Sequence, residues 1–284
     1  MARIGDYNLH TVDTGSFALD GGAMFGIVPK PLWEKRIPGD GSNRIRLRAR
    51  CLLVEGNGRL TLIDAGIGDK PDEKFRHIFG VEFESGNLVG SLRELGFSVD
   101  DVTDVVLTHL HFDHCGGASV RVGDRLGVAF PRARYHVQRE HWAWANDPGP
   151  RERASFLSEN LSPLSESGQL RLVDKTAEIA PGLSVRTVNG HTTAMQLVKV
   201  QDAATALVYV ADLLPTVHHV APAWNMAYDL RPLTTMSEKE SLLAEAHEGR
   251  WHLFFEHDPD VEVASVRQGD RGYQLTDFRP LSEL

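Results

Sequence analysis

Hydrophobic and polar residues alternate over RIRLRARCLLVEG, residues 44–56. Apolar side chains stand at every second position from Ile45 to Leu53, and the positions between them include Arg46, Arg48 and Arg50. Successive side chains of a strand point to opposite faces, so this pattern predicts a strand with one buried face. Asn57-Gly58 is typical of a hairpin turn, and RLTLIDAG, residues 59–66, predicts the returning strand.

Short apolar runs bounded by turn residues predict further strands. One lies within residues 102–117 and leads directly into a group of histidines; the others cover residues 135–137, 170–173, 183–188, 196–200, 206–211, 252–256 and 261–266. Helices are expected at 87–97, around 141–145, around 151–159 and at 237–250. In the last helix, Ser237 stands three residues before Glu240, the spacing of a capping box, and Gly249 suits its end.

Many strands interleaved with fewer helices predict two sheets covered by helices within one domain, residues 1–284. The sequence contains no repeat of fixed period. Its Pro- and Gly-rich pieces, such as IPGDGSN and VAPAWNMAYDLRP, are interpreted as loops of that domain and not as linkers between domains.

The charge balance limits the class of partner. There are 30 Lys and Arg against 39 Asp and Glu, a formal net charge of -9. Nucleic acids and anionic membranes attract basic surfaces, so we expect neither as a partner. The sequence shows no signal peptide and no apolar run of about eighteen residues, the length of a membrane-spanning helix. Cys51 and Cys115 cannot build a disulfide framework, so we expect free thiols in a cytoplasmic protein.

The segment THLHFDHCGG, residues 108–117, carries His109, His111, Asp113 and His114 at the end of an apolar run. Residues two apart in an extended segment point the same way, so the first three converge on one side. Imidazole and carboxylate groups are ligands of zinc and similar divalent ions, and a following glycine pair lets backbone approach closely. A polar loop without metal is the alternative, and four such residues at a strand exit favour a metal site.

Three more predicted strands end on residues of the same type. VNGHTT places His191 after a strand and a glycine, LVYVADLLP ends on Asp212, and WHLFFEHDPD ends on His257. Enzymes commonly build sites from side chains at the ends of rigid strands.

In this order, HLHFDH, GHT, AD and EHD resemble the motifs of the metallo-β-lactamase superfamily. The resemblance runs from LLVEGNGRLTLIDAGIGD to FFEHDPD and so covers almost the whole chain. It implies an α/β fold, the αββα four-layer sandwich, and a hydrolase that depends on two divalent metal ions. Zinc is the first expectation, with manganese, iron or cobalt as alternatives, because this ligand set suits them all.

The resemblance assigns a role to each motif residue. The first metal site would be held by His109, His111 and His191, the second by Asp113, His114 and His257, and both by Asp212. Asp64, in LIDAG, matches an aspartate that lies behind the ligands and is expected to orient a ligand histidine, with a carboxylate that stabilises a turn as the alternative. Since the ligand set is complete without Cys115, we interpret that residue as a small buried side chain.

The chemistry implied is hydrolysis. A hydroxide bridging two ions about 3.5–4 Å apart would attack an ester-like centre, while one metal polarises the oxygen of that centre. Asp113 and the bridging Asp212 are the catalytic candidates, and Asp113 is expected to pass a proton to the leaving group. The sequence contains no GxSxG motif, so it gives no indication of a serine nucleophile.

Within the superfamily the chain most resembles the branch of N-acyl homoserine lactone lactonases and methyl-parathion-type hydrolases. The resemblance rests on DGGAMFGIVPKPLWEK and PAWNMAYDL. It predicts a quorum-quenching lactonase acting on a small molecule. The alternatives are an organophosphorus triester hydrolase and a non-catalytic binding or regulatory protein on the same fold.

An N-terminal loop extension, about residues 15–43, is expected either to line the substrate pocket or to form the interface of a homodimer. Aromatic, methionine and histidine side chains in the loops could form an apolar pocket, although a role in the core or at a dimer interface is the alternative. The candidates are Met24, Phe25, Trp33, His218, Trp224, Met226 and Tyr228.

The sequence departs from this branch at two positions. Many of its lactonases carry a tyrosine three residues after the bridging aspartate, where it can help polarise the lactone carbonyl, and here that position is Pro215. Ala194 stands where a glycine commonly follows GHT. His218 or His219 could supply a polar group instead, although we interpret these adjacent histidines as surface residues.

Overall fold

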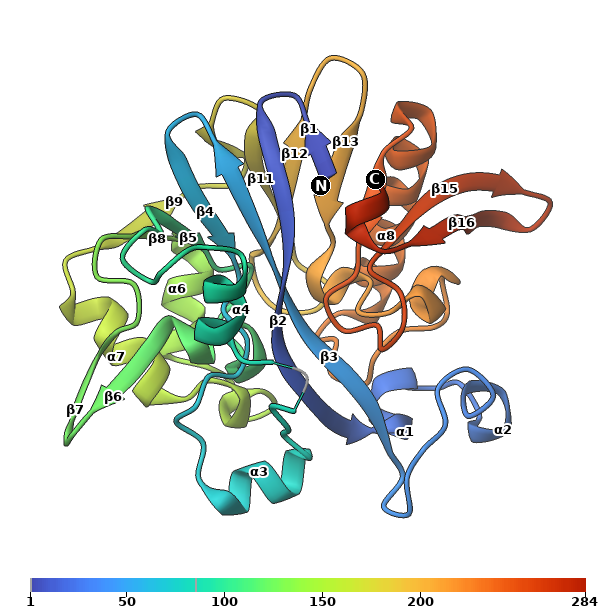
Figure 1. The fold of residues 1–284 in the computed structure, drawn as a ribbon. Coiled ribbons are helices and arrows are strands. Elements are labelled where there is room, and N and C mark those ends of the chain that lie inside the picture. Colours follow the sequence, from blue (N-terminus) through green and yellow to red (C-terminus); the bar gives the residue numbers. More distant parts are fainter. Residues whose placement is uncertain (1, 85) are drawn as a thin grey trace.

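Two seven-stranded sheets lie face to face in the computed structural model, which describes residues 2–84 and 86–284 (Figure 1). The first sheet has the order β1-β2-β3-β4-β5-β8-β9 and the second the order β10-β11-β12-β13-β14-β15-β16. Side chains from the facing surfaces of both sheets form one buried core, which includes Leu52, Val106, Leu197 and Phe254. The predicted αββα sandwich is confirmed.

The first sheet and a separate hairpin come from the first part of the chain. Their strands are β1 (Ala2–Ile4), β2 (Tyr7–Asp20), β3 (Arg44–Gly56), β4 (Arg59–Ile63), β5 (Asp104–Val106), β6 (Ser119–Val122), β7 (Arg125–Val128), β8 (Arg134–Gln138) and β9 (Leu170–Val173). The second sheet contains β10 (Ala177–Ala180), β11 (Leu183–Val188), β12 (Met195–Gln201), β13 (Ala206–Tyr209), β14 (His252–Phe254), β15 (Val263–Gly269) and β16 (Gly272–Arg279).

Helices cover the outer faces of the sheets and the rim below them (Figure 1). The α-helices are α1 (Gly21–Phe25), α2 (Lys30–Trp33), α3 (Glu73–Phe79), α4 (Leu88–Glu94), α5 (Phe112–Cys115), α6 (Arg139–Asn146), α7 (Ser158–Glu166) and α8 (Pro232–Gly249). Short 3-10 helices are η1 (Gly116–Ala118), η2 (Arg153–Ser155), η3 (Ala211–Leu213), η4 (Val217–Val220) and η5 (Leu281–Glu283). None of the helices in the described residues is long and apolar enough to span a membrane.

β3 is buried more fully than its alternating sequence predicts. Leu52 and Val54 face the second sheet, whereas Cys51 and Leu53 belong to a second core under α4. Arg50 is buried as well, because its guanidinium donates hydrogen bonds to the carbonyls of Phe255, Asp258, Pro259 and Val261. A strand between a sheet and a helix layer has no solvent-facing side, so β3 is buried continuously from Ala49 to Val54 and is more open only towards its two ends.

The expected N-terminal loop extension is partly wrong, because residues 15–20 belong to β2. This strand pairs with β3 from Asn8 to Asp20, with a bulge between Asp13 and Ser16. The turn beyond it folds into α1 and α2 (Figure 1). Asp20 caps α1 by accepting a hydrogen bond from the backbone N–H of Ala23.

Two helix boundaries also differ from the prediction. α8 begins at Pro232, so Ser237 lies inside it and caps nothing; a proline at the first helical position lacks the N–H that a helix leaves unpaired there. The helix ends with Arg250 in a left-handed conformation, one residue beyond Gly249. The helix expected around residues 151–159 is instead η2 followed by α7, which extends to Glu166.

Parallel strand pairs determine where the loops gather. β4, β5 and β8 run parallel in the first sheet, as do β13 and β14 in the second. The carboxyl ends of parallel strands meet at one edge of a sheet, and loops there commonly carry functional residues. The predicted ligands follow β5, β11, β13 and β14, so the fold brings them to that edge between the sheets.

Candidate metal centre

The histidine-rich segment leaves β5 and turns into the single-turn helix α5. The turn depends on close packing: a Cβ on Gly116 would lie 1.9 Å from the carbonyl oxygen of Ile67. Only glycine allows this approach, so Gly116 lets the segment fold back against the loop after β4. His109, His111, Asp113 and His114 are all buried in the resulting bend.

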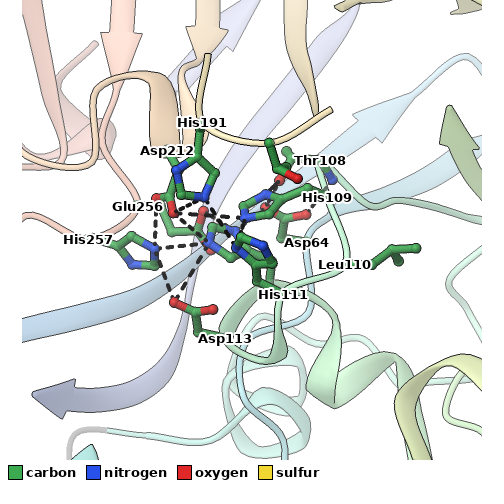
Figure 2. A network of polar contacts seen from close by, with 12 residues as sticks. Asp64, Thr108, His109, Leu110, His111, Asp113, His191, Asp212, Glu256 and His257 are labelled. Atoms are coloured by element: carbon green, nitrogen blue, oxygen red, sulfur yellow. Dashed lines mark hydrogen bonds and ion pairs between the residues drawn. The ribbon is translucent and has the colours of Figure 1, made fainter. Parts of the chain in front are cut away.

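Three histidines and Asp212 form a first group of ligand-type atoms, which we call the first metal group (Figure 2). Nδ1 of His111 lies 3.1 Å from Nε2 of His109 and 3.2 Å from Nε2 of His191. Nε2 of His191 is also 3.1 Å from Oδ2 of Asp212. Three ring nitrogens therefore point at one another, the arrangement of imidazoles that share a cation.

A second metal group contains Asp113, His114 and His257. Figure 2 labels Asp113 and His257 of this group. The Nε2 atoms of His114 and His257 are 3.1 Å apart, and each is 3.8 Å from Oδ2 of Asp113. Asp212 reaches this group too, because its carboxylate oxygens lie 3.6 Å from Nε2 of His114 and 3.3 Å from Nε2 of His257. Asp212 thus contacts both groups and stands where a bridging ligand would.

Each of the five histidines has a polar group near its other ring nitrogen. These outer contacts are His109 with the hydroxyl of Thr108 (3.1 Å), His111 with the carboxylate of Glu152 (3.4 Å), His114 with that of Asp64 (3.0 Å), His191 with that of Asp229 (3.1 Å) and His257 with the carbonyl of Arg48 (2.8 Å). Such contacts orient ligand histidines and favour the tautomer that binds metal.

His114 has a second carboxylate beside the same nitrogen. Oε2 of Glu256 lies 3.0 Å from its Nδ1, as does Oδ2 of Asp64, and both carboxylates are fully buried. Burial raises the pKa of Glu256 to about 7, opposed by His114 and reinforced by the charge of Asp64. Asp64 also accepts hydrogen bonds from the backbone N–H and hydroxyl of Thr108, so it connects β4 to the start of the histidine segment.

The residues of both groups fit divalent ions. Oδ1 of Asp212 is buried without a hydrogen bond from any described residue, an arrangement that a cation would stabilise. Burial alone would raise the pKa of Asp212, but His191, His114 and His257 lower it well below its usual range, so the carboxylate is ionised. Burial lowers the pKa of His109 far below its usual range, so its ring is neutral and can act as a ligand.

Four residues around the centre were not found from the sequence. Asp229 lies in the quoted segment PAWNMAYDL and Glu256 directly precedes His257, so an acidic residue beside a motif was the available signal. No pattern in the sequence points to Glu152 or His141. His141 is buried, accepts a hydrogen bond from the backbone N–H of Leu110 and donates one to the carbonyl of Thr193, which connects the two histidine motifs.

A cavity of about 440 Å³ opens onto both groups. Asp113, Asp212 and three of the ligand histidines form its floor, and two loops and the end of β2 contribute to its walls. The wall residues are Leu19, Met24, Leu47, Phe79, Phe112, Arg151, Glu152, Ala154, Ser155, Met226, Ala227 and Tyr228. Most of them are apolar, as in sites that take small organic molecules.

Three of the seven predicted pocket residues lie in this wall, namely Met24, Met226 and Tyr228. The other four, Phe25, Trp33, His218 and Trp224, do not line it. Phe25 stacks on Trp33 (5.5 Å between ring centroids) and on His219 (4.9 Å), and contacts Trp224 edge-on. These aromatic rings form a core behind Met24 instead.

His219 is therefore not the surface residue expected. It is buried, its Nε2 donates a hydrogen bond to the carbonyl of Met24, and its Nδ1 pairs with the hydroxyl of Thr216. Cys115 is buried as expected, and its thiol donates to the carbonyl of Leu110. Ala194 has a left-handed backbone (φ 53°), which explains why glycine suits that position.

Comparisons with known proteins agree with this geometry. The solved structure of a probable metal-dependent hydrolase from Staphylococcus aureus superposes with a TM-score of 0.89, at 30% identity over 97% of both chains. The structure of AidC, a dizinc quorum-quenching lactonase, has a TM-score of 0.80 at 20% identity and covers 98% of this chain and 97% of its own. An N-acyl homoserine lactonase from Bacillus cereus is 23% identical over 176 residues, 58% of this chain and 63% of its own.

The matched regions span between 36% and 63% of the length of the curated relatives. A family profile described as the metallo-beta-lactamase superfamily matches residues 45–257, which include all seven ligand-type residues. Together with the two-sheet fold and the His/Asp groups, this match shows that the chain belongs to the metallo-β-lactamase superfamily.

Proposed function

We propose that this protein is a dinuclear metal-dependent hydrolase that opens N-acyl homoserine lactones. The main support for metal-dependent hydrolysis is the position of Asp212. Its carboxylate reaches both metal groups at the floor of a cavity. When bound there, two divalent ions would supply Lewis acidity and a water molecule activated at neutral pH.

Asp113 is the proposed proton carrier. Its carboxylate lies on the cavity floor and 3.8 Å from Nε2 of both His114 and His257. It therefore faces the substrate and the second metal group at once. A carboxylate in this place can take a proton from the attacking water and deliver it to the leaving oxygen.

The apolar wall supports an acylated substrate. Leu19, Met24, Leu47 and Phe79 offer hydrocarbon surface beside the metal groups, and burial of an acyl chain there would contribute about 0.8 kcal/mol per methylene group. A lactone ring would then lie over Asp113, with its chain along this wall.

Tyr228 is the proposed hydrogen-bond donor to the lactone. Pro215 offers no hydroxyl after the bridging aspartate, whereas Tyr228 is the phenol among the described residues of the cavity wall. Burial, followed by the charges of Asp20 and Asp113, raises the pKa of Tyr228 to about 12. The phenol therefore keeps its proton at neutral pH and can donate it to a substrate oxygen.

The test is a comparison of kcat/KM for N-hexanoyl homoserine lactone and an aryl phosphotriester on metal-loaded protein of known metal content. We expect the lactone to be hydrolysed faster by several orders of magnitude. A higher kcat/KM for the triester would instead identify the protein as an organophosphorus hydrolase. No hydrolysis of either substrate by fully loaded protein would contradict the proposed lactonase.

A further inference from the structure

Two loops contribute to the wall of the cavity: the first wall loop, residues 147–157, and the second wall loop, residues 221–231. We propose that Glu152 and Asp229 are positioning residues that connect these loops to two histidines of the first metal group, so that metal binding there orders the substrate cavity. The inference rests on the metal-dependent part of the proposed function and not on the identity of the substrate.

Glu152 makes the connection in the first wall loop. Its side chain is buried, and its Oε2 lies 3.4 Å from Nε2 of His111 and accepts a hydrogen bond from the hydroxyl of Thr192 (2.9 Å). Its other oxygen accepts from the indole of Trp144. Phe156, in the same loop, packs against the ring of His111 with 4.9 Å between the centroids. The loop therefore touches His111 twice.

Asp229 makes the matching connection in the second wall loop. It is buried, and its Oδ1 lies 3.1 Å from Nδ1 of His191. The next residue strengthens the attachment, because the backbone N–H of Leu230 donates to the carbonyl of His191. Three residues before Asp229, Met226 lines the cavity.

Outer partners of the other histidines do not belong to the wall loops. His109, His114 and His257 pair with Thr108, Asp64 and Glu256, and the carbonyl of Arg48, none of which lines the cavity. Among the described residues, the contacts of His111 and His191 are the ones that extend from the metal groups into the two loops. Binding of a metal ion to the first metal group can therefore affect the order of both wall loops.

Tautomer selection gives the coupling a physical cause. A neutral imidazole carries its proton on one nitrogen, and the other nitrogen has the lone pair that a metal takes. A cation in the first group would take Nδ1 of His111 and Nε2 of His191, the atoms that face each other at 3.2 Å. The protons must then stand on the opposite nitrogens. His191 would donate its proton to Asp229 across 3.1 Å. Nε2 of His111 has no hydrogen bond from the described residues and lies 3.4 Å from Glu152, so metal binding would turn this contact into a charge-assisted hydrogen bond.

Arg151 joins the two wall loops directly. Its guanidinium donates a hydrogen bond to the carbonyl of Ala227, and both residues line the cavity. This contact connects loop to loop without a histidine. The two loops could therefore be ordered in two ways, through the contacts of Glu152 and Asp229 with the histidines or through the contact of Arg151 with Ala227. A variant of Arg151 distinguishes these two ways.

The experiment is hydrogen–deuterium exchange of the whole protein, chelated and then loaded with zinc. We expect zinc to slow exchange in both wall loops by about tenfold, the factor that one hydrogen bond can supply. In Glu152→Gln the slowing is lost in residues 147–157 and kept in 221–231, because an amide offers one acceptor where the carboxylate served three donors. Asp229→Leu shows the reverse pattern.

Two further variants serve as controls. Glu140→Gln makes the same chemical change on the exposed face of α6 and should keep the slowing in both loops. Arg151→Met leaves both carboxylates in place, so both loops should still respond to zinc. If Arg151→Met abolishes the response, or if zinc binds without slowing exchange in either loop of the unaltered protein, the proposal is wrong.

The readout is independent of substrate. If zinc orders both loops and the lactone is not hydrolysed, the proposed lactonase falls and the coupling stands. If the protein hydrolyses the lactone but its loops do not respond to zinc, the proposed coupling is wrong and the proposed lactonase remains.

Discussion

Tyr228 offers the most direct test of the proposed chemistry at the scale of single residues. Tyr228→Phe removes the hydroxyl and keeps the ring in the cavity wall. We expect kcat/KM for the lactone to fall roughly a hundredfold, as when one donor to a developing oxyanion is removed, and KM to change little. Tyr273→Phe on β16 is the matched control. A variant with unaltered kcat would show that Tyr228 only shapes the cavity.

Asp212 tests whether the two metal groups act as one centre. In Asp212→Asn one charged oxygen is replaced by an amide nitrogen, which cannot bind a cation, so one of the two groups loses its shared ligand. We expect about half of the wild-type metal content and no measurable hydrolysis. The control is Asp202→Asn, which changes an exposed carboxylate in the β12–β13 turn and should keep both the metal content and the activity of the wild type. Full metal content in Asp212→Asn would contradict the bridging role.

His219 predicts how stability depends on pH. Burial, with smaller effects of Lys239 and His218, lowers its pKa to about 3 in the folded protein, against about 6.5 in the unfolded chain. Between these values the unfolded chain binds one proton more, so stability falls as pH decreases from 6.5 towards 3. The contribution is about 1.4 kcal/mol per pH unit.

His219→Gln keeps a donor and an acceptor at this place but does not titrate. We therefore expect the difference in unfolding free energy between wild type and variant to change by about 1.4 kcal/mol per pH unit between pH 6 and 4. Urea unfolding at a series of pH values measures it. Parallel pH curves for the two proteins would show that His219 is already protonated when folded.

Residues that lie close together in the sequence could be predicted, and those brought together by the loops could not. His109, His111, Asp113 and His114 fall within six positions, and the short motifs around the other ligands could be recognised in order. Glu152 and its partner His111 are 41 positions apart in the chain, and no local pattern connects them. An orienting carboxylate outside the motifs, such as Glu152, is therefore visible only in the fold, whereas Asp64 could be predicted from its own motif.

α8 carries a prediction at the scale of elements. Its Lys239 is buried, and the ammonium group donates hydrogen bonds to the carbonyls of His219, Ala221 and Trp224 at 3.0–3.2 Å. Lys239→Met fills a similar volume but leaves the carbonyls of His219 and Trp224 without this donor, whereas the carbonyl of Ala221 still accepts from the backbone N–H of Trp224. We expect a loss of about 2–4 kcal/mol in unfolding free energy, since an unsatisfied buried polar group costs about 1–3 kcal/mol.

Urea unfolding of Lys239→Met measures this loss, and Lys74→Met, at an exposed position of α3, is its control. The second wall loop begins among these carbonyls, so KM for the lactone should rise as well. Equal stability of Lys239→Met and the wild type would mean that solvent satisfies the carbonyls.

Elements with a clear period were predicted better than elements held by their neighbours. β3 and β4, joined by Asn57-Gly58, follow from alternation and turn chemistry. β2 was not predicted at all. Gly15 and the bulge interrupt its alternation, and β3 supplies its hydrogen bonds. α8 was predicted to begin five residues too late, because its first turn looked like the end of a loop.

At the scale of the whole molecule, the candidate centre joins the two halves of the chain. Asp113 and three of its neighbours follow the first sheet, whereas His191, Asp212 and His257 follow strands of the second. Backbone contacts cross at the same place, since the N–H groups of Arg48 and Arg50 donate to the carbonyls of His257 and Glu256. Ions held by both halves would therefore stabilise the sandwich as a whole.

Removal of metal should then lower the stability of the entire fold. A ligand that binds only the folded state contributes about 4.1 kcal/mol when its concentration is 1,000 times its Kd. For a domain of this size, 1 kcal/mol corresponds to about 2–4 °C, so we expect chelation to lower Tm by roughly 10 °C. Calorimetry of chelated and zinc-loaded protein measures the shift. Asp212→Asn should show a smaller shift, because it has less metal to lose. An unchanged Tm, with metal analysis proving removal, would mean that hydrogen bonds between histidines and carboxylates alone hold the halves together.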